Sequence, residues 1–308
     1  MQALHNLLTL GRVSNLPTVW SNCLAAWVVN RYASSTDLLD LQGKEGDLLP
    51  PWEPLLWLMC GASLVYLAGC TLNDAFDQEF DKRHNPQRPI PSGATSARTV
   101  WVIGFVELGL GIFVLLQLCQ VDWVWLLLLV LVILLYDAIH KKWKGSVWLM
   151  GSCRFFLWLT AASAADPQIA SLTFSWAGII ALYVVGISLF ARGETTKDTS
   201  SKKFPIPLLF GPFVFAVYLL LAATQSPVPA ATLACMCGAL VSGRLVLFGF
   251  RNVKSGKSGG IGKGVSLLLA GIAAGDAAAA GLLFPTMGWA CLSCVPIALL
   301  LQKRFAAT

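Results

Sequence analysis

The sequence predicts an all-α fold, a polytopic transmembrane helical bundle of nine to ten helices, and three observations predict it. First, 56% of the 308 residues are hydrophobic and only 12% are charged, whereas an ordinary soluble domain carries about 25% charged residues. Second, the mean hydropathy is +0.68. Third, apolar segments of about 20 residues, the length that crosses the hydrocarbon core of a bilayer, follow one another almost from end to end. No long polar stretch separates them, so we expect one domain over residues 1-308 and exclude a water-soluble fold.

The individual spans follow from these apolar segments. They are expected near 14–31, 54–72, 100–118, 121–138, 147–164, 173–191, 206–224, 229–249, 264–283 and 286–302. Pro296 lies inside the last of them, and only a short break at Pro285 separates it from the ninth. A re-entrant or interfacial final helix is therefore an alternative to a tenth span.

The basic residues predict the orientation of the chain, because Lys and Arg concentrate in cytoplasmic loops. They follow the second, fourth, sixth and eighth segments, while the opposite loops carry mostly acidic residues. No cleaved signal peptide is indicated, and we expect a cytoplasmic N terminus. The net charge of +6 is then explained by topology and by contact with an anionic leaflet. It gives no support to nucleic-acid binding.

A cluster of polar residues leaves the second segment. Asp74, Asp77 and Asp81 are spaced so that three carboxylates share one helix face, with Asn73 beside them. Mg²⁺ would relieve their mutual repulsion, because it binds a few carboxylates and completes its shell with water and phosphate oxygens. Arg88, a short distance downstream, can bind the remaining phosphate charge bidentately. The cluster therefore predicts a site for a phosphorylated substrate and Mg²⁺.

The alternative for this cluster is a solvated helix end with scattered charges. Glu79 and Lys82 fit that description. The three aspartates and Asn73 do not, because they begin directly at the end of an apolar helix, where polar groups are costly and usually functional.

A second acidic pair, Glu194 and Asp198, leaves the sixth segment at a spacing of i and i+4. By the predicted topology both acidic motifs face the cytoplasm. Two carboxylate sets on separate helices around one cavity suit a diphosphate held through bridging Mg²⁺ ions. The alternative is an ordinary exposed loop, with Lys197 between the two acids.

These residues resemble the first motif of the UbiA family of membrane prenyltransferases, Asn-Asp-x-x-Asp-x-x-x-Asp followed by Arg-Pro-Leu/Ile-Pro-Ser-Gly. The two parts stand here at Asn73 to Asp81 and at Arg88 to Gly93. The family's second motif, Asp-x-x-x-Asp, is matched by Glu194 and Asp198, with Glu in the first position. The interval before Arg88 is shorter than in the hydroxybenzoate enzymes of the family. The opening from Asn15 to Asn22 looks more like the EboC-type branch of bacterial secondary-metabolite gene clusters.

The resemblance implies an all-helical bundle around a central cavity open to the membrane. It implies Mg²⁺-dependent transfer of a prenyl group from an isoprenoid diphosphate to an aromatic or other small acceptor, with release of diphosphate. The implied catalytic residues are Asn73, Asp74, Asp77, Asp81, Glu194 and Asp198, with the five acids as metal ligands. Tyr136, Lys141 and Lys142 stand in the region that contacts the diphosphate in the family, and Lys141 and Lys142 are expected to bind it with Arg88.

Two other functions remain open from the residues. The same cavity would suit a membrane carrier or transporter of an isoprenoid or pathway intermediate, although no inverted repeat is visible between the halves. A terpene cyclase on the same scaffold would need no acceptor. The expected partners are the lipid bilayer and these small molecules, with no nucleic acid and no obligate protein partner.

Four polar residues are expected inside spans. Glu107, Arg154 and Asp276 cannot face lipid cheaply, and Asn22 lies in the first span. Glu107 and Arg154 are expected at a similar depth, which makes an ion pair between them possible. The alternative for Arg154 is to bind the acceptor or the diphosphate. Asn22 has the same two readings, substrate contact or a hydrogen bond between helices.

Overall fold

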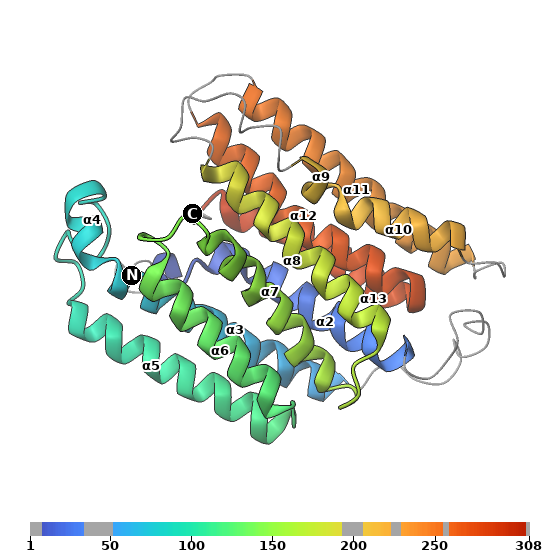
Figure 1. Ribbon diagram of the computed structural model, residues 1–308, viewed down its shortest axis with the longest axis horizontal. Helices are drawn as coiled ribbons and strands as arrows, with labels where there is room; N and C mark the ends of the chain where they lie inside the picture. The colour runs from blue at the N-terminus through green and yellow to red at the C-terminus, as the bar shows by residue number, and fades with distance from the viewer. Residues whose placement is uncertain (1–7, 34–51, 193–205, 223–228, 255–258, 306–308) are drawn as a thin grey trace.

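A computed structural model describes residues 8–33, 52–192, 206–222, 229–254 and 259–305, and every regular element of these residues is helical (Figure 1). Six of the helices are long and apolar enough to cross a membrane, and two more are apolar but shorter. The predicted all-α, multi-pass membrane fold is therefore confirmed. The long helices lie side by side, and the short helix α4 lies at one end of the bundle (Figure 1).

The elements follow one another along the chain with short connections. In the first half they are η1 (Val13–Asn15), α2 (Leu16–Ala33), α3 (Trp52–Phe76), α4 (Gln78–His84), α5 (Ala97–Phe113), the π-helical turn η2 (Val114–Leu118), α6 (Trp123–Ile139) and α7 (Ser146–Ser163). In the second half they are α8 (Ser171–Arg192), α9 (Ile206–Leu209), α10 (Gly211–Ala222), α11 (Pro229–Lys254), α12 (Gly260–Leu283) and α13 (Pro285–Gln302).

The seventh expected span, 206–224, is not one continuous helix. It is divided into α9 and α10, and Pro212 stands at the second position of α10. Proline has no backbone N–H and its ring clashes with the preceding turn, so the helical hydrogen-bond ladder is interrupted there. The tenth expected span is present as α13, which is long and apolar enough to cross a membrane although it contains Pro296.

Helix α2 lies at the centre of the bundle. It packs against α3, α7, α8, α12 and α13, and side chains such as Val19, Ala25 and Val28 are fully buried. A helix that is surrounded by other helices can carry polar residues toward protein partners. This position explains why α2, with Asn22 and Asn30 buried in its middle, is not among the six helices that are apolar enough to span by composition.

Asn30 joins α2 to the connection between α7 and α8. Its Nδ2 lies 3.1 Å from Ala162 O, 2.9 Å from Asp166 O and 3.1 Å from Gln168 O. Its Oδ1 accepts from Ala170 N at 2.9 Å and from Thr173 Oγ1 at 3.1 Å. One fully buried amide therefore satisfies the polar backbone where two helices turn.

We expect Asn30→Ala to lower the free energy of unfolding by about 1–3 kcal/mol, because the buried carbonyl and N–H groups lose their partner. The measurement is the midpoint of unfolding in mixed micelles titrated with a denaturing detergent. The matched control is Asn252→Ala, which removes only a solvent-exposed hydrogen bond to Phe248 O. Equal midpoints for the two variants would contradict this role of Asn30.

Helices α11, α12 and α13 pack closely through small residues. A Cβ added at Gly238 of α11 would lie 2.5 Å from Ala278 N and 2.9 Å from Ala277 C of α12. A Cβ added at Gly288 of α13 would lie 2.5 Å from Gly281 Cα of α12. Glycine at these positions allows the backbones to approach, as is common between transmembrane helices.

Candidate functional site

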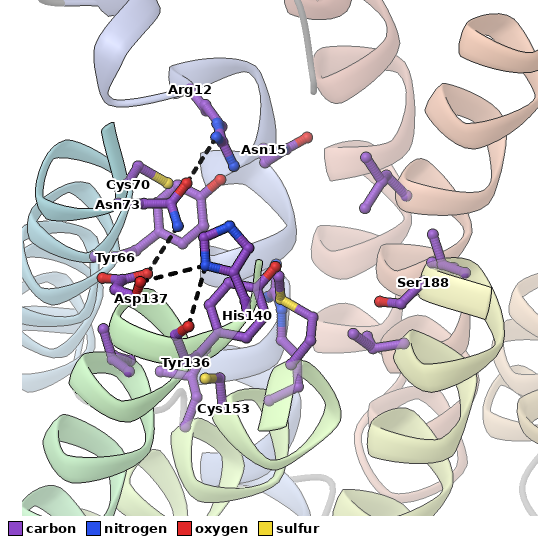
Figure 2. Close-up of a pocket in the computed structure, with 18 of the residues that line it drawn as sticks. Arg12, Asn15, Tyr66, Cys70, Asn73, Tyr136, Asp137, His140, Cys153 and Ser188 are labelled. Carbon is purple, nitrogen blue, oxygen red and sulfur yellow. Dashed lines mark hydrogen bonds between the residues drawn. The ribbon is translucent and has the colours of Figure 1, made fainter. Parts of the chain in front are cut away.

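The bundle contains a cavity of about 430 Å³. Arg12, which precedes η1, lines it together with residues of α3, α6, α7, α8 and α12 (Figure 2). The lining is polar at one end and apolar along the rest. The polar end is formed by Arg12, Asn73, Asp77, Arg88, His140 and Lys141. The cavity that the resemblance implied is therefore present, while its opening to the membrane stays a prediction.

The four residues of the first acidic motif lie at this polar end, where α3 gives way to α4. Asn73 and Asp74 belong to the last turn of α3, Asp77 is the residue between the helices, and Asp81 belongs to α4. Asp77 N donates to Asn73 O at 2.9 Å and Asp81 N donates to Asp77 O at 2.8 Å, so helical turns continue through the junction. All four side chains are buried, with exposed fractions of 5, 8, 4 and 1%.

Arg88 joins two of the carboxylates. Its Nη1 lies 3.2 Å from Asp74 Oδ1 and 2.8 Å from Asp81 Oδ2. Arg12 reaches the same place from the other side, with Nη2 at 3.6 Å from Asp74 Oδ1 and 3.2 Å from Asn73 Oδ1. Two guanidinium groups thus balance the acids, and both line the cavity.

Asp77 is held by two basic residues of the α6 end. His140 Nε2 and Lys141 Nζ each lie 3.2 Å from Asp77 Oδ2. Burial by itself would raise the pKa of Asp77, but the hydrogen bond and charge of His140, together with Lys141, lower the pKa below its ordinary value. Asp77 is therefore a carboxylate near neutral pH. Lys141 also lies over the ring of Phe80, 4.3 Å from its centroid.

Asp137 of α6 orients the amide of Asn73. Asn73 Nδ2 donates to Asp137 Oδ1 at 3.0 Å (Figure 2), which turns Asn73 Oδ1 toward Arg12. Asp137 is beside the basic stretch in sequence and could have paired with its lysines. Instead it faces α3, because the lysines lie beyond the end of α6 while Asp137 lies on its buried side.

The other predicted residues fall into two groups. Tyr136, Lys141 and Arg154 line the cavity, whereas Lys142 is exposed and does not line it. Glu194 and Asp198 lie outside the described residues. Glu79 and Lys82 are exposed and form an ion pair of 2.7 Å with each other, as expected for a solvated helix end.

The possible ion pair between Glu107 and Arg154 is not formed. Glu107 accepts a hydrogen bond from Thr71 Oγ1 of α3 at 3.0 Å, and Arg154 donates to Asn22 Oδ1 of α2 at 2.6 Å. The reason is the packing order, because α5 contacts α3 whereas α7 contacts α2, α6 and α8. Similar depth in the membrane does not make two helices neighbours. Asn22 makes helix-to-helix hydrogen bonds and is not among the residues that line the cavity.

Three residues of the cavity were not anticipated from the sequence, namely Arg12, Tyr66 and His140. Arg12 stands just before the first apolar segment in a left-handed conformation, with φ of 45°, which turns the chain ahead of η1. Its closeness to the first span is the one signal in the sequence. His140 follows Tyr136 by one helical turn, so a helical count from Tyr136 would have placed both on one face.

The donor chemistry at the polar end fits Mg²⁺ in one form. Within the described ranges, no three His, Cys, Asp or Glu side chains converge in a set that could hold a metal ion. Asp74 and Asp81, however, both lie within 3.2 Å of one cationic atom, Arg88 Nη1. Mg²⁺ is usually bound by one or two carboxylates, with waters and substrate phosphates completing its shell. A two-carboxylate site therefore fits, and a site built wholly from protein ligands does not.

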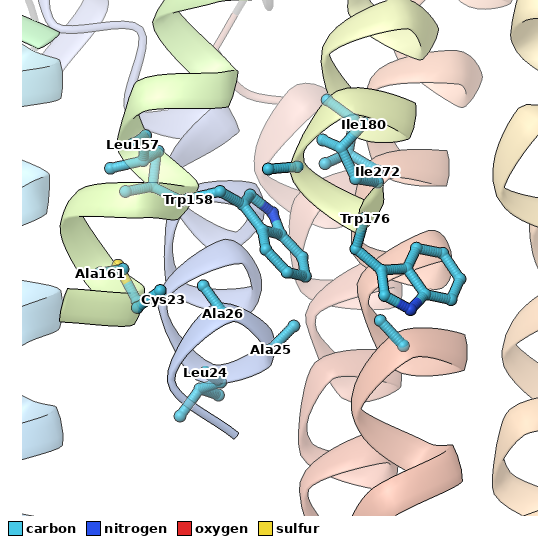
Figure 3. Close-up of a cluster of buried hydrophobic side chains, with 14 of the residues drawn as sticks. Cys23, Leu24, Ala25, Ala26, Leu157, Trp158, Ala161, Trp176, Ile180 and Ile272 are labelled. Carbon is cyan, nitrogen blue, oxygen red and sulfur yellow. The ribbon is translucent and has the colours of Figure 1, made fainter. Parts of the chain in front are cut away.

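The other end of the cavity is closed by apolar packing. Leu157 and Ile272 line the cavity and belong to the large buried hydrophobic cluster. Figure 3 shows them beside Trp158 and Ile180, which fill the interior between α2, α7, α8 and α12. An apolar chain whose head group sits at the polar end would thus be surrounded by hydrocarbon side chains.

Comparisons with known proteins agree with this arrangement. A model of the UbiA prenyltransferase family matches residues 45–253. The digeranylgeranylglyceryl phosphate synthase of Pyrococcus horikoshii is 33% identical over 97 residues, which is 32% of this chain and 32% of that protein. The 4-hydroxybenzoate octaprenyltransferase of Acidovorax ebreus is 33% identical over 93 residues, which is 30% of this chain and 27% of that protein. The chain thus spans about a third of the length of the curated relatives it matches.

Solved structures extend the similarity over nearly the whole chain. A UbiA homologue from Archaeoglobus fulgidus bound to GPP and Mg²⁺ has a TM-score of 0.55 and 15% identity, and covers 94% of this chain and 99% of that chain. A structure of digeranylgeranylglyceryl phosphate synthase in membranes has a TM-score of 0.55 and 18% identity, with 91% and 99% covered. At these identities the likeness establishes the fold alone.

Proposed function

The chain belongs to the UbiA prenyltransferase family, and on that premise we propose that it transfers a prenyl group from an isoprenoid diphosphate to a small acceptor with the help of Mg²⁺. One observation carries the proposal. A single cavity joins a polar end, where buried carboxylates alternate with arginine, histidine and lysine, to a lining of hydrocarbon side chains. A charged head and an apolar tail are the two parts of a prenyl diphosphate.

The proposed roles follow from the contacts. Asp74 and Asp81 would hold Mg²⁺, which supplies charge to the leaving diphosphate when bound. Arg12, Arg88 and Lys141 now neutralise carboxylates and would bind diphosphate oxygens. The allylic C1–O bond breaks with its electron pair moving to the diphosphate, the acceptor atom bonds to C1, and the acceptor releases a proton. Asn73, held by Asp137, positions Arg12.

The two regions beyond the described contacts enter the proposal from the sequence. Glu194 and Asp198 would complete the binding of the diphosphate, as the family's second motif does. We also assign the whole chain to one domain, since α2 packs against helices from both halves. The polar end is assigned to the cytoplasmic side, as the distribution of basic residues predicts. The EboC-type branch stays a prediction.

The test is a product assay on purified protein in lipid nanodiscs. Geranyl, farnesyl and geranylgeranyl diphosphates are each combined with phenol, 4-hydroxybenzoate, resorcinol and indole, and products are identified by mass. We expect a prenylated product that forms one-to-one with diphosphate and disappears on addition of EDTA, with activity restored by Mg²⁺.

Two outcomes would overturn the proposal. A product formed from the donor alone would identify a cyclase. Uptake of a labelled donor into sealed vesicles without cleavage of the C–O bond would identify a carrier. The control is a preparation of empty nanodiscs, which should release no diphosphate under the same conditions.

A further inference from the structure

A second polar cluster lies deeper in the cavity than the acidic motif. It consists of Arg154 on α7, Thr18, Ser21 and Asn22 on α2, and Asp276 on α12. Arg154 lines the cavity, while Asn22 and Asp276 are fully buried. We call these five residues the inner cluster.

The inner cluster is separated from the diphosphate end by a length of helix. Ser146, the first residue of α7, donates to His140 O at 3.2 Å. Arg154 is eight residues further along α7, which at 1.5 Å per residue corresponds to about 12 Å. The cavity wall between them includes Met150 and Cys153. A group held by Arg154 is therefore a different group from the diphosphate held near His140.

The guanidinium is fixed by acceptors from α2. Arg154 Nη1 lies 2.6 Å from Asn22 Oδ1 and 3.2 Å from Thr18 O, and Nη2 lies 2.9 Å from Thr18 Oγ1. In the part of the chain that the structure describes, Arg154 forms no salt bridge, and its Nε donates to no protein acceptor. A guanidinium has five N–H donors in a planar fork, so donors remain for a molecule in the cavity.

The position of the guanidinium is controlled by a buried carboxylate. Asp276 Oδ2 accepts from Asn22 Nδ2 at 2.7 Å and from Ser21 Oγ at 2.6 Å. These bonds orient the Asn22 amide so that its oxygen faces Arg154. The carboxylate thus balances the cation through an intervening amide and leaves the cavity side of the guanidinium open. A clasp between helices alone would need only neutral polar side chains, which are common between transmembrane helices.

From this geometry we propose that Arg154 binds an oxygen of the prenyl acceptor, and that Asn22 and Asp276 position the guanidinium for this contact. The inference rests on the proposed transferase function and names its second substrate by class. The acceptor is a small molecule with a hydroxyl, carbonyl or carboxylate oxygen remote from the atom that becomes prenylated. Thr18 and Asn22 hold the guanidinium fork rigidly, so the remote oxygen also orients the acceptor.

The test compares Arg154→Gln with wild type, using the acceptor of the product assay that wild type prenylates fastest. Hydrogen bonds to a charged donor are among the stronger ones, and we expect the acceptor KM to rise by at least about tenfold. The donor KM should change by less than twofold. Arg154→Lys, which keeps the charge and loses the fork, should fall between the two. The control is Arg244→Gln, on the exposed face of α11, which should change neither KM.

A pair of acceptors gives a second readout that a merely structural role of Arg154 would not move. Wild type should prefer resorcinol over m-cresol, in which a methyl group replaces the remote hydroxyl, and Arg154→Gln should lose this preference. If Arg154→Gln does not fold, Asp276→Asn should raise the acceptor KM in the same direction.

Two results would overturn the inference while leaving the transferase function intact. One is an unchanged acceptor KM in both Arg154→Gln and Asp276→Asn. The other is a resorcinol preference that survives in Arg154→Gln. Failure of wild type to prenylate any acceptor would instead count against the proposed function itself.

Discussion

Replacing Asp74 and Asp81 together by Asn should lower Mg²⁺-dependent diphosphate release by about 10²–10³-fold. The two amides keep the shape of the side chains and remove the charge that would hold the metal. A metal ion supplies several kcal/mol of stabilisation to the departing charge, and each 1.36 kcal/mol corresponds to about tenfold in rate. The measurement is phosphate-coupled detection of diphosphate from geranyl diphosphate, at a series of Mg²⁺ concentrations.

The control for this experiment is Glu79→Gln. Glu79 belongs to the same short helix as Asp81, but it is exposed and pairs only with Lys82, so this variant should retain the wild-type rate. A double Asp74→Asn, Asp81→Asn protein that is folded and still releases diphosphate at the wild-type rate would show that these two acids do not hold the metal.

The second large effect is expected at the contact between α11 and α12. Gly238→Leu should leave little monodisperse protein after size-exclusion chromatography. The reason is that even a Cβ at Gly238 meets the backbone of α12 at 2.5 Å, and backbone cannot rotate away as a side chain can. Gly238→Ala should cost about 1–3 kcal/mol, as overpacking usually does, seen as a lower midpoint in a denaturing-detergent titration.

A glycine with open space around it provides the matched control. A Cβ at Gly178 of α8 would have no atom within 4 Å among the described residues, and alanine has the higher helix propensity. Gly178→Ala should therefore keep or raise the unfolding midpoint. If Gly238→Ala and Gly178→Ala behaved alike, the close approach of α11 and α12 would not matter for stability.

The helices could be predicted from the sequence because hydropathy and length are local properties. The seventh span was wrong in its continuity, since a single apolar count does not register the break at Pro212. The central position of α2 also escaped prediction. Whether a helix faces lipid or other helices depends on its neighbours, and the apolar count of a segment does not identify them.

The acidic side of the site was accessible to sequence reasoning, because Asp74, Asp77 and Asp81 lie within two helical turns. Its basic side was only half accessible. Arg88 is close in sequence, whereas Arg12 reaches Asn73 across 61 residues. Lys141 and Lys142 looked equivalent, yet only Lys141 lies at the cavity. A one-residue difference rotates a side chain by roughly a quarter turn or more around a helix end, and only packing decides which one faces inward.

The glycine contacts among α11, α12 and α13 have a consequence for how the cavity adapts to cargo of different girth. At these contacts backbone meets backbone, so no rotamer change can yield space, and the wall contributed by α12 through Val265 and Leu269 is stiff. Compliance resides across the cavity on α7, where Met150 presents an unbranched, easily reshaped thioether. Tolerance toward bulkier substrates is thus governed from one flank of the chamber.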